Sequence, residues 1–269
     1  MLETGFHQGA GLQGLASHTA PRLVAMASHG DRASELPLLW DLCAAWTELG
    51  YPVVVLDATH SETPQQPGLQ QLLDPRSRSE ELPRETADMA WPIYPAGLGL
   101  RQLFAGADRT GYAQPMGQLE QLFQNYDVVL LYAPAALLAE RLPGSGIAPL
   151  MTVSATGSSV LTAYQAIKSL LINGRLQPTI VSMVDTSDQS SKTCGLNLNK
   201  SLQDCARSFL GQQVNTLCVD MRATSDPALR DVNRLALRLL ESGAMQSWED
   251  ARPGWHATMP GHDSAMRSH

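Results

Sequence analysis

The chain lacks several features that mark whole classes of protein. It has only four cysteines in 269 residues, and none of them has a CxxC partner or a histidine at zinc-finger spacing. No run approaches the roughly 18 apolar residues of a membrane span. Lysine and arginine total 19 against 26 acidic residues, giving a net charge of −7, and no basic cluster is present. These absences argue against a cysteine zinc site, stable membrane insertion and nucleic-acid binding through a positive field.

Other site chemistries are also missing. There is no HExxH and no G-x-S-x-G, and His256, His262 and His269 fall near the carboxyl terminus without a metal-ligand spacing. We therefore expect no metal and no cofactor. The segment from Met1 to Thr19 has no charged region followed by an apolar stretch, so we expect no secretory signal, reduced thiols and a cytoplasmic protein.

Short apolar runs alternate with longer helical patterns. Runs of five or six residues that are almost wholly apolar are typical of parallel strands covered on both faces by helices. They occur at Leu23–Ser28, Val53–Ala58, Asp127–Tyr132, Pro149–Ser154, Thr179–Val184 and Val214–Val219. Apolar stripes at helical spacing predict helices around Leu38–Leu49, over Ser159–Ile172 and around Leu235–Leu240.

This alternation predicts an α/β fold with a doubly wound, mainly parallel sheet, in which the first two runs are central and buried. Ligands of such sheets bind beyond the carboxyl ends of the strands. The turns after Ser28, Asp57, Tyr132 and Ser154 are therefore the places to seek a site.

The composition divides the chain into three parts. We expect a flexible leader over residues 1–20, one α/β domain over residues 21–245, and a disordered tail over residues 246–269 that is rich in glycine and proline. Within the domain, the polar stretch Ser61–Ala90 reads as a long surface excursion.

The segment Arg22–Thr59 resembles the first strand, helix and strand of the MinD/ParA-type P-loop ATPases. In that family the first strand leads to a K-G-G-x-G-K-T loop, and the second strand ends in aspartate, as here at Asp57. The loop departs from the family, because its phosphate-binding lysine falls on Glu35 and its magnesium-binding hydroxyl on Leu36. The resemblance implies the fold and makes Asp57 a vestigial cofactor position, whereas the loop indicates a degenerate, nonhydrolysing member.

Other segments extend the resemblance. The run after Asp127, ending in Tyr132-Ala133-Pro134-Ala135-Ala136, is similar to the family's D-x-P-A-G switch, with tyrosine in place of aspartate. Ser182 stands where the family has a base-contacting asparagine. The segment Met151–Leu171 is similar to a stretch of the flagellar FlhG group that contains S-x-x-x-A-Y, matched here at Ser159, Ala163 and Tyr164.

The first residues resemble another FlhG feature. FlhG proteins carry D-Q-A-x-G-L-R ahead of the first strand, and Gln8, Gly11 and Leu12 keep three of these positions, whereas His7 and Gln13 replace the flanking aspartate and arginine. In the family this segment contacts the FlhF GTPase. The resemblance therefore implies Gln8, Gly11 and Leu12 as partner-binding residues, against the alternative of a flexible glycine-rich leader.

Three functions remain open at this point. One is a noncatalytic FlhG-like protein, monomeric or homodimeric, that binds a partner such as an FlhF-type GTPase in flagellar assembly or placement. The second is a MinD/ParA-type switch that binds nucleotide through an atypical loop. The third is a small-molecule enzyme on the same scaffold, against which the lack of a clustered nucleophile and base counts.

Two helices also carry alternatives. Gly157-Ser158-Ser159 is either an anion-binding helix start or an ordinary one capped by Ser158. The helix near Leu235 is either a membrane-surface anchor or a core helix. Its polar face mixes Arg234 and Arg238 with acidic residues, which favours the core.

Overall fold

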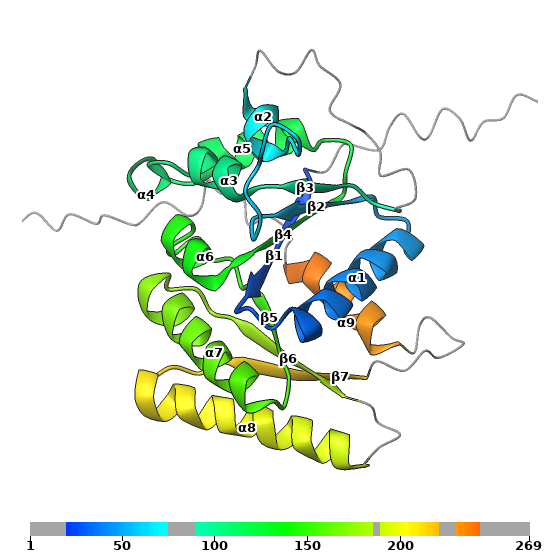
Figure 1. Cartoon of the computed structure of the whole chain (residues 1–269), viewed down its shortest axis with the longest axis vertical. Helices are drawn as coiled ribbons and strands as arrows, with labels where there is room; N and C mark the ends of the chain where they lie inside the picture. Colours follow the sequence, from blue (N-terminus) through cyan, green and yellow to red (C-terminus); the bar gives the residue numbers. More distant parts are fainter. Residues whose placement is uncertain (1–19, 75–89, 185–188, 221–229, 243–269) are drawn as a thin grey trace, which may run out of the picture.

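A computed structural model describes residues 20–74, 90–184, 189–220 and 230–242 (Figure 1). Its centre is a seven-stranded sheet of order β3-β2-β4-β1-β5-β6-β7, in which every neighbouring pair is parallel. The strands are β1 (Arg22–Ser28), β2 (Val53–Asp57), β3 (Ile93–Pro95), β4 (Val128–Pro134), β5 (Leu150–Val153), β6 (Thr179–Val184) and β7 (Asn215–Asp220).

Helices connect the strands and cover both faces of the sheet. They are α1 (Arg32–Glu48), α2 (Leu69–Leu73), α3 (Gly97–Leu103), α4 (Ala107–Thr110), α5 (Ala113–Leu122), α6 (Ala135–Arg141), α7 (Gly157–Lys168), α8 (Gln189–Leu210) and α9 (Asp231–Ser242). A π-helical turn, η3 (Ser169–Asn173), continues α7. No helix in the described part of the chain is long and apolar enough to cross a membrane.

Alternate residues of each strand build two separate cores, as the two-residue period of a strand requires. On one face, Ala25, Leu56 and Leu131 pack with side chains of α3, α5, α6, α7 and α8. On the other, Met26, Val55 and Leu130 pack with α1 and α9. Burial on both faces explains why these strands are continuously apolar in the sequence.

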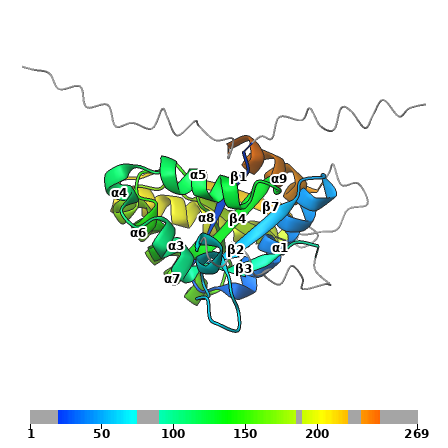
Figure 2. The same ribbon diagram turned by 90° about the horizontal axis from the view of Figure 1, so that it is seen from above.

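Helices α1 and α9 are neighbours on the second face (Figures 1 and 2). Trp46 of α1 is fully buried, and its indole Nε1–H donates a 3.0 Å hydrogen bond to the carbonyl oxygen of Ala236 in α9. Leu235 and Leu240 are buried in the same core. The interpretation of α9 as a core helix is therefore confirmed.

The predicted fold class is confirmed, and β1 and β2 are both internal to the sheet, with β1 at its centre.

One expectation was partly wrong. The stretch from Ser61 is not wholly a surface excursion, because Glu62 and Leu69 are buried and Leu69 begins α2. The 22-residue helix α8 was not expected, because its sequence is mostly polar. The predicted leader, apart from Ala20, and the predicted tail lie outside the described residues.

Candidate functional site

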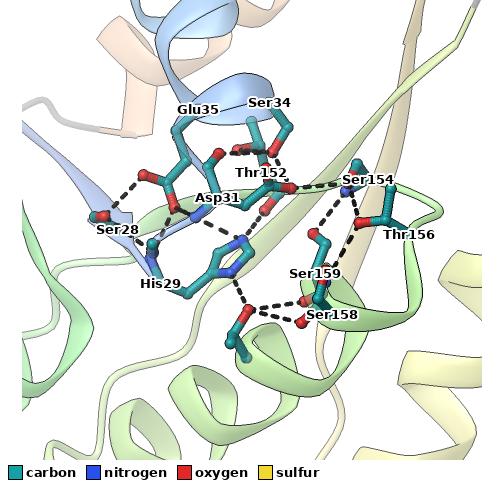
Figure 3. Close-up of polar contacts among 12 residues, drawn as sticks. Ser28, His29, Asp31, Ser34, Glu35, Thr152, Ser154, Thr156, Ser158 and Ser159 are labelled. Carbon is teal, nitrogen blue, oxygen red and sulfur yellow. Dashed lines mark hydrogen bonds and ion pairs between the residues drawn. The ribbon is translucent and has the colours of Figure 1, made fainter.

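A polar cluster lies at the carboxyl ends of β1, β4 and β5, where ligands of doubly wound sheets bind. Figure 3 shows its residues around the start of α1, the end of β5 and the start of α7. Only residues 29–31 separate the end of β1 from the start of α1. This short connection turns the first residues of α1 back over the strand end. The amino end of α7, which follows β5, closes the other side of the cluster.

The carboxylate of Glu35 is the centre of the cluster and is fully buried. Its two oxygens accept four hydrogen bonds. The donors are the hydroxyl of Ser28 at 2.7 Å, the backbone N–H of His29 at 2.8 Å, the backbone N–H of Asp31 at 3.2 Å and the hydroxyl of Tyr132 at 2.5 Å. We call these four groups the Glu35 donor set.

The Glu35 donor set has the character of an anion-binding seat. Two of its members are backbone amides that precede a helix, and an acidic group in the first turn of a helix also interacts favourably with the helix dipole. Here the anion is a side chain of the protein itself. A residue without an acceptor atom at position 35 would leave four donors facing one another in a dry site, which costs several times the value of one hydrogen bond.

His29 links the Glu35 donor set to β5 and α7. Its side chain is almost fully buried, with Nε2 2.7 Å from the carbonyl oxygen of Thr152 and Nδ1 2.9 Å from the hydroxyl of Thr162. Because a carbonyl oxygen only accepts, Nε2 carries a proton. The same nitrogen lies 3.7 Å from the Glu35 carboxylate. The imidazole is thus held on three sides and is not directed at solvent.

Asp31 forms the more exposed side of the cluster. Its carboxylate accepts hydrogen bonds from the hydroxyls of Ser34 and Ser154, each at 2.8 Å. Burial acts to raise the pKa of Asp31, but hydrogen bonding from Ser159, Ser154 and Ser34, helped by the nearby His29, lowers it below its ordinary value. Asp31 is therefore a fixed negative charge at the mouth of the cluster.

Tyr132 is held as a hydrogen-bond donor. Its ring is almost fully buried, and burial together with the hydrogen bond to Glu35 raises the pKa of the phenol well above its ordinary value. The phenol consequently keeps its proton and serves Glu35. Tyr132 occupies the position at which the resemblance places the switch aspartate. In this protein, that position therefore supplies a hydrogen-bond donor to Glu35 instead of a carboxylate.

Asp57 was the predicted vestigial position, and it lies at the end of β2 as expected. Its carboxylate accepts from the backbone N–H of Thr59 at 2.9 Å and the hydroxyl of Thr59 at 2.6 Å, and His60 Nδ1 lies 2.8 Å away. The Arg32 guanidinium reaches the hydroxyl of Thr59 at 3.4 Å. The Asp57 carboxylate thus stabilises the turn that follows β2.

A second buried carboxylate was missed by the sequence reasoning. Glu62 accepts hydrogen bonds from the backbone N–H groups of Gln70 at 3.1 Å, Leu98 at 2.7 Å and Gly99 at 2.8 Å. These amides belong to the first turns of α2 and α3, so Glu62 neutralises two helix starts at once. A lone glutamate in a polar stretch gives no sequence signal for this role.

The other candidate residues have varied outcomes. Helix α7 is capped by the hydroxyl of Thr156, which accepts from the N–H of Ser159, so the expected cap at Ser158 was wrong. Ser182 is buried and donates to the side chain of Asn199 at 2.6 Å. Gln8, Gly11 and Leu12 lie outside the described residues. Within the described ranges, no group of three acidic, histidine or cysteine residues could hold a metal ion.

Comparison with known proteins gives similarity of structure only. No protein-family model matches the chain, and no curated protein matches its sequence. Among solved structures, the ParA protein of pnob8 is 11% identical, with a TM-score of 0.51 over 82% of this chain and 99% of that one. Cobyrinic acid a,c-diamide synthase from Mycobacterium smegmatis, solved with ADP and magnesium, is 17% identical, with a TM-score of 0.49 over 86% and 97%. MinD in the MinC:MinD complex of Aquifex aeolicus is 13% identical, with a TM-score of 0.42 over 83% and 93%. The protein thus has the α/β fold of ParA-type ATPases.

Proposed function

We propose that this protein is a noncatalytic relative of the MinD/ParA-type ATPases that acts by binding a protein partner. The observation that carries the proposal is the buried carboxylate of Glu35, which already takes up the amides between β1 and α1. A nucleotide phosphate would need those amides and a nearby cation. The chain has no lysine before Lys168, and Lys168 lies at the opposite end of α7 from the cluster.

Electrostatics supports the same conclusion. Two like unit charges about 4 Å apart repel by about 4 kcal/mol at an effective dielectric constant near 20. A phosphate at the Glu35 donor set would meet the carboxylates of both Glu35 and Asp31, whereas the other groups there are hydroxyls, two backbone amides and the imidazole of His29. Binding would therefore require Glu35 to leave four hydrogen bonds while a second negative charge enters.

We expect ATP with Mg²⁺ not to bind at micromolar affinity and not to be hydrolysed above background. Isothermal titration calorimetry on the full chain measures binding, and phosphate release measures turnover. Glu35→Gln is the informative companion, because it removes the charge and keeps the volume. It should also fail to bind, since Leu36 still replaces the magnesium-binding hydroxyl. A one-site isotherm with the unchanged protein would overturn the proposal and support the nucleotide-dependent switch instead.

We further propose that the partner is an FlhF-type GTPase and that the role is in flagellar assembly or placement. Support comes from the spacing of Gln8, Gly11 and Leu12 and from the S-x-x-x-A-Y match in α7. The described chain begins at residue 20 and runs directly into β1, the central strand of the sheet. A leader that becomes ordered only on binding loses conformational entropy, so the affinity should be modest.

Deletion of residues 1–20 should abolish binding of the FlhF-type GTPase of the same cell, because the leader would supply the Leu12 anchor and the Gln8 hydrogen bonds. Gln8→Ala and Leu12→Ala should each weaken binding by roughly tenfold, a loss of about 1.4 kcal/mol, without changing thermal stability. Pull-down and titration with the full chain provide the measurement.

The matched controls for the leader are His7→Ala and Gln13→Ala, which alter the two positions where the resemblance fails. Both should bind as the unchanged protein does. Equal binding by the full and truncated chains would exclude the leader as the recognition element.

A further inference from the structure

The Glu35 donor set is a complete binding site that is filled from within. Its donors come from the end of β1, the connection to α1, and β4, and they converge on two oxygen atoms. Tyr132 lies 97 positions from Glu35 in the sequence, so the convergence is a property of the fold and not of one turn. The carboxylate is tethered to the protein only through two methylene groups.

We propose that the Glu35 donor set is a latent site for a small carboxylate, which an external ligand occupies when the Glu35 side chain is shortened. This inference rests on the proposed function in one respect, namely that the seat holds a protein carboxylate instead of a nucleotide phosphate. The inference goes beyond the proposed function because it assigns to the Glu35 donor set an affinity for free small carboxylates.

The shape of the vacated space specifies the ligand. Replacing glutamate by alanine removes one methylene carbon and the carboxylate group, which together have the heavy atoms of acetate. Acetate can accept from Ser28, His29, Asp31 and Tyr132 through two oxygens, as Glu35 does. Formate supplies the oxygens without the methylene carbon, so it should bind more weakly. Phosphate is tetrahedral and carries further oxygens for which the donor set offers no partner.

The surroundings keep the site selective. Tyr132 is almost fully buried and Ser28 is nearly so, which makes the seat dry and strengthens each hydrogen bond to an anion. The His29 imidazole lies 3.7 Å from the carboxylate and is fixed by contacts with Thr152 and Thr162. Because the side chain is fixed, the backbone N–H of His29, which donates to the carboxylate, is held in place as well. Chloride cannot bridge two separated donor pairs as a carboxylate does.

The test is thermal unfolding of the full-length Glu35→Ala variant in different sodium salts of equal ionic strength. In chloride, Tm should fall by about 5–10 °C relative to the unchanged protein. In about 0.2 M acetate, Tm of the variant should recover by about 3–6 °C, with a smaller recovery in formate and, in phosphate, only the general stabilisation that the unchanged protein also shows. The unchanged protein should show no difference between acetate and chloride.

Two further variants separate site occupation from a general salt effect. Glu35→Gln keeps the seat filled with an amide, so acetate should not raise its Tm. Leu42→Ala removes a buried apolar side chain about two turns along the same helix from Glu35, so it should also be insensitive to acetate. Equal responses of all variants to acetate, or of Glu35→Ala to acetate and chloride, would overturn the proposal.

The experiment remains decisive if Glu35→Ala does not fold in chloride. Refolding it in acetate and recording near-ultraviolet circular dichroism is then the same test, and a chain that stays unfolded there contradicts the latent site. The two proposals also fail separately. ATP binding by the unchanged protein overturns the proposed function, whereas an absence of acetate rescue in a protein that does not bind ATP overturns only the latent site.

Discussion

A Glu35→Lys variant is expected to lose about 3–5 kcal/mol of unfolding free energy and to gain no affinity for ATP. The substitution places a family-like lysine in the loop, yet the side chain would enter a dry site where Ser28, Tyr132 and two backbone amides all donate. An ammonium group has no acceptor function, so the two backbone amides would lose their partner, and the two hydroxyls could interact with it only by turning to accept. The cationic group would also remain buried without the carboxylate that now balances the site.

Urea denaturation followed by circular dichroism measures the loss, and calorimetry with ATP and Mg²⁺ measures binding. Glu241→Lys makes the same change of charge at an exposed position of α9, where an effect within about 0.5 kcal/mol is expected. Similar losses for the two variants, or ATP binding by Glu35→Lys, would contradict the assignment of Glu35 as the internal ligand of the loop.

Trp46→Ala is the second substitution with a large expected effect, a loss of about 3–5 kcal/mol in unfolding free energy. Trp46 is completely buried between α1 and α9, and its indole donates to the Ala236 carbonyl. Truncation leaves a cavity and removes the polar link that fixes the register of the two helices. Helix α9 packs on the face of the sheet opposite α6 and α7. If α9 detaches, the core that it forms with α1 and that face of the sheet becomes exposed.

The matched control is Trp40→Ala, on the same helix. Trp40 is only half-buried and packs against Trp91 at a ring-centroid distance of 5.5 Å, so its removal should cost less than half as much. Trp46→Phe should fall between the two, since it keeps an aromatic ring and loses the donor. Urea denaturation compares the series, and equal losses for Trp40→Ala and Trp46→Ala would show that the α1–α9 contact contributes little.

The strands could be predicted because their signal is local. Runs such as Val53–Ala58 are apolar at all but one position, which is typical of a strand buried on both faces, and the observed β2 ends within one residue of the prediction. Helix α1 was predicted from a stripe that includes Leu38, Leu42 and Trp46, all of which are buried. Helix α8 escaped prediction because its long polar surface hides the few residues, such as Leu202 and Ala206, that contact the core.

The site could be located but not assembled from the sequence. The turns after Ser28, Asp57, Tyr132 and Ser154 were the places predicted for a site, because ligands of such sheets bind beyond the carboxyl ends of the strands. Glu35 was recognised as a charge in a lysine position, whereas its role as an acceptor depends on Tyr132, which is 97 positions away. The contact between His29 and Thr162 spans 133 positions. Periodicity carries no information about such pairs, since their geometry is set by the sheet register.

The strand order has a consequence for synthesis of the chain. In the sheet, β1 pairs with β4 and β5, so β1 cannot form its strand hydrogen bonds until these later strands are synthesised. Arg22 pairs with Val128, and Met26 pairs with Leu150. Roughly 100 residues must be added in between, which takes about 5–20 s at ribosomal elongation rates. During that interval the nascent chain presents an unpaired apolar strand, a template for aggregation. Chaperone demand should therefore fall in two steps, first when β4 and then when β5 leaves the ribosome tunnel, because only then are both edges of β1 paired.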